Sequence, residues 1–472
     1  MEGITLELAR LATETKWEDL PPSIVKETKL ILMDTVGCAL GALATEKGKI
    51  NVSLAKRYGG PPESSIIGVG DKVSCSNAAF ANGELFITLD YSNIMAGGHD
   101  GVYVIPTILA MAESVGASGK DLVLASALGF EISSRIARAV GRHNITPEAV
   151  QRQRTAQPGL MGNAYSNFGA AAGAGRLMKL NEDKMLHALG VAGHLCMVLS
   201  YSRWGFGKDR YMAKYAVPGW QSTGAVAATL LAEMGYTGDT TVLDDPEHGF
   251  AHFVGFKNWY PDEITDKLGK EWCFDFRLHY KPYPCCAVFH GVLDCFVEII
   301  EKNKLKPEEI ESVKVYGRGG FDAGLFGRKE VDTISAAQFN PRYNISVAAH
   351  RIPVGVEWIE PQTMKNPDIL KFMDKITGVS HPDYVKELER DPLSALSKVD
   401  VVARGKTFTV ERKYRRGTVG TKARLTDEET AAKFRHNASR TLSREKIDKA
   451  VTAFMGLEKV KNISELIALI TK

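Results

Sequence analysis

A carboxylate and an imidazole lie close together in the segment LDYSNIMAGGHDG, residues 89–101, between two apolar segments that are both typical of helices. Asp90 and His99 could move a proton or hold a polar substrate. The Gly-Gly step before His99 lets the backbone turn sharply and approach a ligand closely. An ordinary helix–helix loop with a capping Asp90 would use the same residues. The segment therefore predicts either a proton-transfer loop or a capped turn.

Cationic side chains gather in a second segment, SRWGFGKDRYMAKYAVPGW, residues 202–220, again between two apolar stretches. Its cations include Lys208, Arg210 and Lys214. Cations that are half buried need anionic partners, and several together suit a substrate that carries several carboxylates. The alternative is a solvated loop whose lysines and arginines form surface ion pairs.

A third segment, HYKPYPCCAVFH at 279–290, places Lys281 beside two prolines and is followed by Cys285, Cys286 and His290. A Cys–His nucleophile is one interpretation of this order. Buried thiols that serve as small apolar side chains are the other, and the commoner, interpretation.

Two further segments place polar residues just before apolar helices. In PGLMGNAYSNFGAAAGAG, residues 158–175, the helix N-terminus would favour an anion, although a tight turn explains the glycines equally well. In AQFNPRYN, residues 337–344, Arg342 and Tyr343 could contact a ligand or a domain interface.

Composition excludes several classes of function. The chain of 472 residues has a net charge of +3, 44% hydrophobic and 24% charged residues, which gives no reason to expect a nucleic-acid or membrane partner. The N-terminus has no secretory signal pattern, and no apolar run is long enough for a membrane span. The odd number of cysteines, 7, without any C-x-x-C pair, indicates reduced thiols in the cytoplasm and no structural zinc or iron–sulfur cluster.

Together these segments place cations, an imidazole, a carboxylate and a phenol at helix junctions, with no metal or nucleotide signature. They favour acid–base chemistry on a small polyanion, with no cofactor and no metal.

Apolar periodicity predicts a mainly α fold that holds these segments. Residues 1–271 contain one helix after another, rich in Ala and Gly, which indicates a tight bundle. Residues 272–422 alternate between strand and helix patterns, with a strand and a turn expected within 272–286 and a hairpin turning at Arg404–Lys406. Residues 423–472 return to helices. We therefore expect a large helical domain built from both chain ends and an inserted, smaller α+β lid domain.

The order of these segments resembles the MmgE/PrpD family, which includes 2-methylcitrate dehydratases, cis-aconitate decarboxylases and iminodisuccinate epimerases. The resemblance covers nearly the whole chain and rests on ILMDTVGCALGA, the 77–113 segment around LDYSN and GGHDG, NFGAAAGAGRLMKL, KYAVPGWQSTGAVAATLLAEMGY, YKPYPCCAVFHGVLD, AAQFNPRYNISVA and the AAKF helix.

The resemblance implies a homodimer with a site in the cleft between the two domains. By position in the family's motifs, the catalytic residues would be Asp90, His99, Lys214, Lys281 and Tyr343. Substrate-binding residues are expected nearby; Lys208 and Arg210 come from local charge, and the others are Asn163, Tyr165 and Arg342.

The sequence departs from the family pattern at several of these positions. Asn163 stands where members usually have a histidine, and an amide hydrogen-bonds but does not exchange a proton near neutral pH. Tyr165 is close enough in sequence to take over a proton role. Val217 replaces another usual histidine, and a longer loop brings Arg152 and Arg154 toward the site.

The sequence thus predicts a cofactor-independent lyase or isomerase that transfers a proton next to a carboxylate of a small di- or tricarboxylate. The reaction would be dehydration, decarboxylation or epimerisation, with His99 as the main acid or base and Asp90 orienting it. Two alternatives stay open: a non-catalytic carboxylate-binding protein with a degenerate proton relay, and an enzyme that depends on Cys285 or Cys286.

Overall fold

The computed structural model describes residues 3–95, 98–141, 163–197, 211–214, 217–256, 258–321 and 326–472. Most of these residues are helical, which confirms the prediction of a mainly α fold. The helices of the N-terminal half are α1 (Ile4–Glu14), α2 (Pro22–Ala42), α3 (Glu46–Tyr58), α4 (Cys75–Thr88), α5 (Asp100–Ser114), α6 (Gly119–Ala139), α8 (Ser166–Leu177), α9 (Glu182–His194), α11 (Pro218–Glu233), α12 (Phe250–Val254) and α13 (Asp262–Thr265). A short antiparallel pair, β1 (Ser64–Ser65) and β2 (Lys72–Val73), is the one sheet element described among them.

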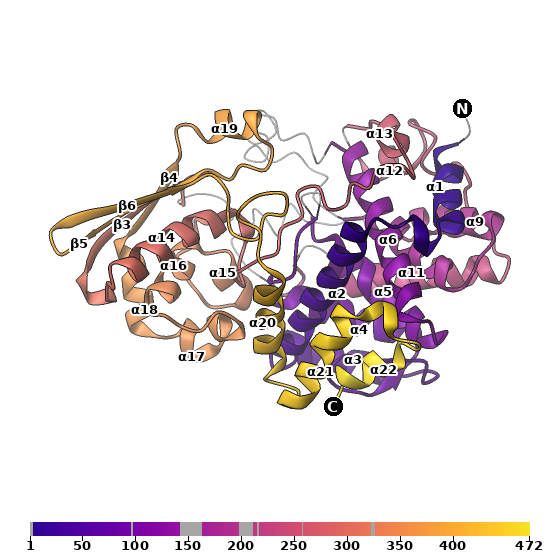
Figure 1. Ribbon diagram of the computed structural model, residues 1–472, viewed down its shortest axis with the longest axis horizontal. Helices are drawn as coiled ribbons and strands as arrows, with labels where there is room; N and C mark the ends of the chain where they lie inside the picture. The colour runs from indigo at the N-terminus through magenta and orange to yellow at the C-terminus, as the bar shows by residue number, and fades with distance from the viewer. Residues whose placement is uncertain are drawn as a thin grey trace.

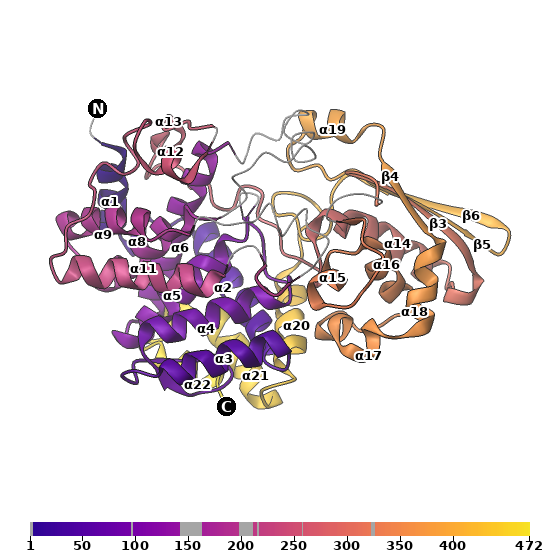
Figure 2. The ribbon, with the colours of Figure 1, turned by 180° about the vertical axis from the view of Figure 1, so that it is seen from behind.

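Glycines let the helices of this half approach one another closely. A Cβ at Gly169 of α8 would overlap the carbonyl oxygen of Gly129 on α6, and one at Gly219 of α11 would overlap the carbonyl oxygen of Phe80 on α4. Figure 2 shows α3, α4, α5 and α11 lying side by side in this bundle. The Ala- and Gly-rich faces of the sequence therefore serve close helix packing.

The end of the chain returns to the bundle. Helices α20 (Asp427–Ala438), α21 (Arg444–Met455) and α22 (Ser464–Leu469) follow the sheet, and α20 and α21 pack against α2 (Figure 1). The Thr426 hydroxyl accepts a hydrogen bond from the backbone N–H of Glu429, and the Thr426 backbone N–H donates one to the Glu429 carboxylate. This capping box is the helix start that the TDEE sequence indicates.

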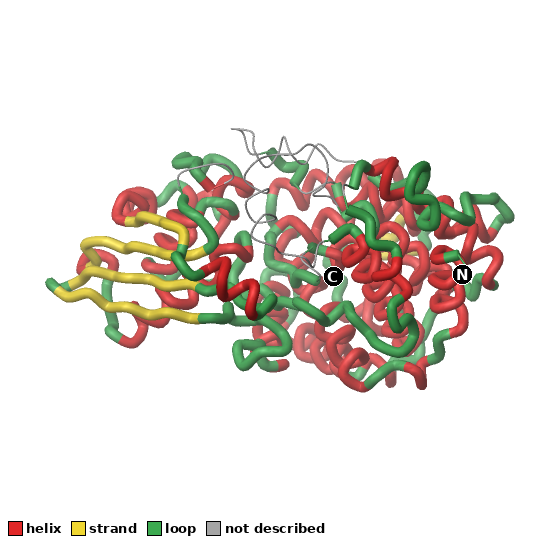
Figure 3. Tube along the Cα trace, turned by 90° about the horizontal axis from the view of Figure 1, so that it is seen from above, coloured by secondary structure: helices red, strands yellow, loops and turns green. Residues whose placement is uncertain are grey.

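A four-stranded sheet with the order β4-β3-β5-β6 lies at the opposite end of the molecule from the N-terminus (Figure 3). Its strands are β3 (Ile310–Gly317), β4 (Ile376–Ser380), β5 (Ser397–Ala403) and β6 (Lys406–Arg412). Strands β5 and β6 form the predicted hairpin, and Arg404 and Gly405 both have positive φ at its turn. Strand β4 pairs with β3 in parallel, a partner that the sequence did not indicate.

Helices cover this sheet and connect it to the bundle. They are α14 (His290–Lys302), α15 (Ile334–Gln338), α16 (Pro341–Ala349), α17 (Pro361–Met364), α18 (Pro367–Phe372) and α19 (Tyr384–Arg390). Helix α14 contacts β3, β5 and β6, and α16 packs on α14. The sequence predicted domain boundaries at 272 and 422 and a role as a lid for the α+β region between them. Both stay predictions.

The strand expected within 272–286 does not form. The segment makes only isolated bridges, in which His279 pairs with Ile94 on one side and with Thr418 on the other. Turns at both ends explain this, because the Phe276 N–H bonds the Cys273 carbonyl and prolines follow His279. A short stretch of backbone is thereby held between the 89–95 loop and the 416–419 segment.

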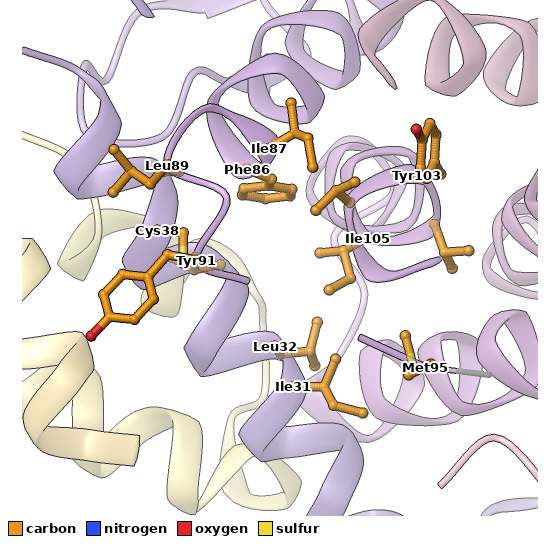
Figure 4. Close-up of a cluster of buried hydrophobic side chains, with 14 of the residues drawn as sticks. Ile31, Leu32, Cys38, Phe86, Ile87, Leu89, Tyr91, Met95, Tyr103 and Ile105 are labelled. Carbon is orange, nitrogen blue, oxygen red and sulfur yellow. The ribbon is translucent and has the colours of Figure 1, made fainter. Parts of the chain in front are cut away.

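Apolar side chains from three helices fix the loop that follows α4. Figure 4 shows Ile31 and Leu32 of α2, Phe86 and Ile87 of α4, and Ile105 of α5 gathered with Tyr91 and Met95 of the loop. All of these side chains are buried.

Among the described residues, no single helix is long and apolar enough to cross a membrane; the bent pair α2 and α3 passes that test by length and composition only.

A buried ion pair joins α2 to α20 beneath this loop. Lys433 Nζ lies 2.6 Å from Asp34 Oδ1, and both side chains are at most 5% exposed. The other oxygen, Asp34 Oδ2, accepts hydrogen bonds from the backbone N–H and the side-chain amide of Asn93, at 2.9 and 3.1 Å. The pair therefore holds the C-terminal helix and the loop on one carboxylate.

We expect Lys433→Met to lower the free energy of unfolding by about 3–5 kcal/mol, because it leaves the Asp34 carboxylate buried without its cation. The matched control is Lys26→Met, since Lys26 also joins α2 to the start of α20, through Asp427, but its side chain is 49% exposed. Urea unfolding of the three proteins measures both effects. Equal losses in the two variants would show that the Asp34–Lys433 pair contributes no more than a surface pair.

Candidate functional site

Asp90 lies directly after the last turn of α4, with a left-handed backbone. Its φ is 50°, in the left-handed region that few residues other than glycine, asparagine and aspartate adopt. Its carboxylate is completely buried, at the end of a helix where the helix dipole disfavours negative charge. An acidic side chain in this position needs strong compensation from cations.

Two lysines supply that compensation. Lys214 Nζ lies 2.9 Å from Asp90 Oδ1, and Lys281 Nζ lies 2.8 Å from Asp90 Oδ2. On the same side as Lys214, His99 Nε2 lies 3.7 Å from Oδ1. The structure thus brings together four of the five side chains predicted to be catalytic, and the cations at this centre outnumber its one carboxylate.

His99 comes to this centre from the start of α5, where it is the N-cap residue. Its side chain is only 11% exposed. Between Asp90 and His99, Met95 and Gly98 exchange backbone hydrogen bonds of 2.8 and 2.6 Å. The loop that interrupts α4 and α5 therefore returns the imidazole to the carboxylate.

Gln338 is a member of the site that the sequence analysis missed. Its side-chain oxygen accepts a hydrogen bond of 2.9 Å from Lys214 Nζ, and its amide nitrogen donates one of 2.8 Å to the carbonyl of Thr88. Gln338 thereby fixes the Lys214 ammonium and ties α15 to the end of α4. The available signal was a glutamine within the otherwise apolar run AAQF. Arg342 and Tyr343 of the adjacent NPRY sequence were predicted instead.

The second cation is fixed through its backbone. Lys433 Nζ donates hydrogen bonds of 3.0 Å to the Lys281 carbonyl and 2.5 Å to the Tyr91 carbonyl, while it also pairs with Asp34. Its ammonium lies 3.9 Å from the centre of the Tyr91 ring. One buried lysine outside the centre therefore positions both Lys281 and the loop that carries Asp90.

The charges at the centre set the protonation states. Burial by itself would raise the pKa of Asp90, but the charges of Lys214, Lys281 and His99 outweigh it and hold that pKa well below its usual range. Burial lowers the pKa of Lys214 to about 7, against the opposing charge of Asp90. Asp90 therefore stays ionised, and Lys214 is a group that can gain and lose a proton near neutral pH.

Two predicted substrate-binding residues lie at the start of α8, next to the start of α5. The Tyr165 hydroxyl donates a hydrogen bond of 3.4 Å to the Asn163 side-chain oxygen, and both residues are buried. The neighbouring Ser166 hydroxyl donates one of 3.0 Å to Asp100, which follows His99. Asn163 and Tyr165 are thus held close to the His99 end of the site, and their roles stay predictions.

Other predicted residues are placed differently. The Tyr343 hydroxyl donates a hydrogen bond of 2.6 Å to the Trp358 carbonyl, and the Arg342 guanidinium donates to the carbonyls of Ile376 and Phe321. The hydrogen bonds described for both side chains therefore hold backbone of the α+β part. Their predicted roles in catalysis and binding stay untested. Lys208, Arg210, Arg152 and Arg154 lie outside the described residues.

The thiols of the third segment lack the features of a nucleophile. Burial raises the pKa of Cys285 well above its ordinary value and that of Cys286 to about 11, so both are protonated at neutral pH. His290 Nε2 lies 3.1 Å from the backbone carbonyl of Cys285, not from a thiol, and His290 Nδ1 lies 3.2 Å from His279 Nε2.

In the described ranges, no three His, Cys, Asp or Glu side chains form a group that could hold a metal ion.

The lowered pKa of Lys214 makes stability depend on pH. Between about pH 7 and pH 10.5 the unfolded chain holds the Lys214 proton and the folded chain does not, so stability rises with pH over this window. We expect Lys214→Met to remove up to about 1.4 kcal/mol per pH unit from that slope. Urea unfolding across the window measures it, with Lys26→Met as the control. Equal slopes in wild type and Lys214→Met would mean that Lys214 keeps an ordinary pKa.

Comparison with known proteins agrees with the order of the segments. Residues 6–260 match the MmgE/PrpD N-terminal domain, and residues 283–456 match the MmgE/PrpD C-terminal domain. A cis-aconitate decarboxylase-like protein, oryM, of Aspergillus oryzae is 23% identical over 505 residues, which cover 99% of this chain and 97% of the relative. A cis-aconitate decarboxylase of Aspergillus terreus is 22% identical, covering 99% of this chain and 96% of the relative. A cis-aconitate decarboxylase of Mus musculus is also 22% identical, covering 100% and 94%. Since the two matched domains span most of its length, this chain belongs to the MmgE/PrpD family.

Proposed function

We propose that this protein is a lyase or isomerase of small polycarboxylates that transfers a proton at a carbon next to a carboxylate, using its own side chains. The observation that carries the proposal is the convergence of His99, Lys214 and Lys281 on the buried carboxylate of Asp90. The family and the full-length cis-aconitate decarboxylase relatives support a decarboxylase- or dehydratase-type enzyme. Their names make decarboxylation the first reaction to test.

The cations would act on the charge that develops during the reaction. When a proton or carbon dioxide leaves the carbon beside a carboxylate, the electron pair left behind spreads onto the carboxylate oxygens. Ammonium groups fixed beforehand by Asp90 and Gln338 stabilise that charge without having to reorganise. Lys214 and Lys281 would thus bind the substrate carboxylate and favour the transition state.

His99 is the group best placed to handle the proton. In a decarboxylation the bond to carbon dioxide breaks first, and a protonated His99 gives its proton to the carbanion. In a dehydration a neutral His99 takes the proton while hydroxide leaves, and in an epimerisation the proton returns on the opposite face. Asp90, ionised and close to Nε2, would orient the ring and stabilise its charged form. Lys214, with its pKa near 7, is the second proton carrier available at the centre.

Proton NMR in D2O tests this function. Purified protein is incubated with cis-aconitate, citrate, 2-methylcitrate, malate and tartrate, and each spectrum is followed for deuterium at a carbon next to a carboxylate and for new products. We expect His99→Gln to slow the reaction by at least about 100-fold, because the variant lacks the proton carrier. His248→Gln is the control, since the His248 side chain is 80% exposed. Full activity of His99→Gln would remove His99 from the mechanism, and binding without exchange or product would favour a carboxylate-binding protein.

Replacement of a thiol separates this proposal from a cysteine mechanism. We expect Cys286→Ala to keep the wild-type rate in the same NMR assay, because its thiol is protonated at neutral pH and serves as a small buried side chain. Circular dichroism confirms that the variant is folded. Loss of turnover in folded Cys286→Ala protein would support the nucleophile instead.

A further inference from the structure

Arg277 lies four residues before Lys281, and part of its guanidinium is buried without an acceptor. Its Nε and Nη1 atoms are shielded from solvent, and within the chain that the structure describes neither of them has a hydrogen-bond partner. Burying a charged donor without an acceptor is strongly unfavourable. The position therefore indicates a ligand that brings oxygen atoms to Arg277.

The backbone of Arg277 is strained as well. Its φ is 62°, in the left-handed region that disfavours a long side chain. A hydrogen bond of 3.0 Å from the Leu278 N–H to the Asp275 carbonyl closes this turn. Glycine or asparagine would fit the turn with less strain, so stability does not explain an arginine here.

A second arginine acts on Arg277. Burial and the like charge of Arg415 lower the pKa of the Arg277 guanidinium, and no acidic group contributes to that shift. Arg415 Nη1 donates a hydrogen bond of 3.0 Å to the Ala287 carbonyl. Two like charges in a partly buried place repel each other, and a bound anion would turn that repulsion into attraction.

Backbone pairing connects these arginines to the Asp90 site. His279 and Ile94 exchange hydrogen bonds of 2.9 Å, and the Tyr280 N–H donates one of 2.9 Å to the Gly417 carbonyl, two residues after Arg415. Four residues of extended chain span at most about 13 Å, which limits the separation of the Arg277 and Lys281 backbones. Burial and the charge of Asp90 raise the pKa of the Cys286 thiol, and Arg415 donates its hydrogen bond to the carbonyl of the next residue, Ala287. The arginines therefore adjoin the lysines that face Asp90.

We propose that Arg277 and Arg415 form a second carboxylate-binding subsite beside the Asp90 centre, which selects substrates with one carboxylate more than the two lysines can hold. The proposal rests on the proposed function for the reaction at Asp90 and adds the preference for a tricarboxylate over a dicarboxylate. Both arginines would act in binding and specificity, while His99 and the lysines serve the reacting carbon. Guanidinium groups suit this role, because they bind carboxylates through two parallel hydrogen bonds.

Calorimetry with two unreactive probes tests the subsite. Tricarballylate has three carboxylates, and glutarate has the same carbon chain without the central one. We expect Arg277→Gln and Arg415→Gln to weaken tricarballylate binding roughly 10- to 100-fold and to leave glutarate binding within about threefold. Arg444→Gln is the control, because the Arg444 side chain is 97% exposed. Equal losses for both probes, or none for tricarballylate, would overturn the subsite.

A second variant separates binding from folding. Arg277→Gly relieves the positive φ and removes the buried charge, so we expect it to be at least as stable as wild type toward urea while it loses tricarballylate affinity. A purely structural role for Arg277 predicts the opposite, a less stable protein with unchanged affinity. These calorimetric experiments measure binding alone. If the NMR assay showed no proton exchange with any acid, the proposed reaction would be overturned, but the binding data would still test the subsite.

Discussion

The site depends on keeping one carboxylate ionised although its burial and its place at a helix C-terminus both oppose the charge. Asp90 is completely buried, follows the end of a helix and has a left-handed backbone. Lys214 and Lys281 offset these costs, each through one carboxylate oxygen. Since the two lysines lie 67 residues apart in the chain, on either side of α11, α12 and α13, one carboxylate fixes several segments at once. The geometry of the two lysines is therefore a consequence of how Asp90 is neutralised.

A second buried carboxylate, that of Asp34, holds in place the residues around Asp90. Asp34 of α2 binds Lys433 of α20 and the Asn93 side chain, and Lys433 in turn holds the carbonyls of Tyr91 and Lys281. The C-terminal helices thus reach the Asp90 cluster through one ammonium group, although none of the residues predicted for catalysis belongs to them. This gives the return of the chain to the bundle a physical role, because α20 supplies the ammonium group that bonds both the loop and the Lys281 backbone.

The sequence indicated the elements that have strong local signals. Apolar periodicity predicted the bundle helices, and the alternating pattern around Arg404–Lys406 predicted the β5–β6 hairpin, because each depends on neighbours in the chain. The sequence did not predict the parallel pairing of β4 with β3, which depends on contacts between distant segments, and it predicted a strand within 272–286 where backbone turns leave isolated bridges. The same distinction holds in the site. Asp90, His99, Lys214 and Lys281 stand in recognisable segments, whereas Gln338 and Lys433 act through long-range contacts that no short motif reports.

Strain and charge coincide at the junction between bundle and sheet. Asp90 and Arg277 both have positive φ and both carry buried charge, and their segments meet where Ile94 pairs with His279. A chain selected for stability alone would place glycine in both turns and leave both charges in water. Backbone strain and buried charge are expected to coincide where a protein binds a charged ligand. Charged groups that are already desolvated and oriented need no rearrangement when the ligand binds. A bound polyanion would supply the acceptor that the Arg277 guanidinium lacks, which is the physical basis of the affinity that we propose for this junction.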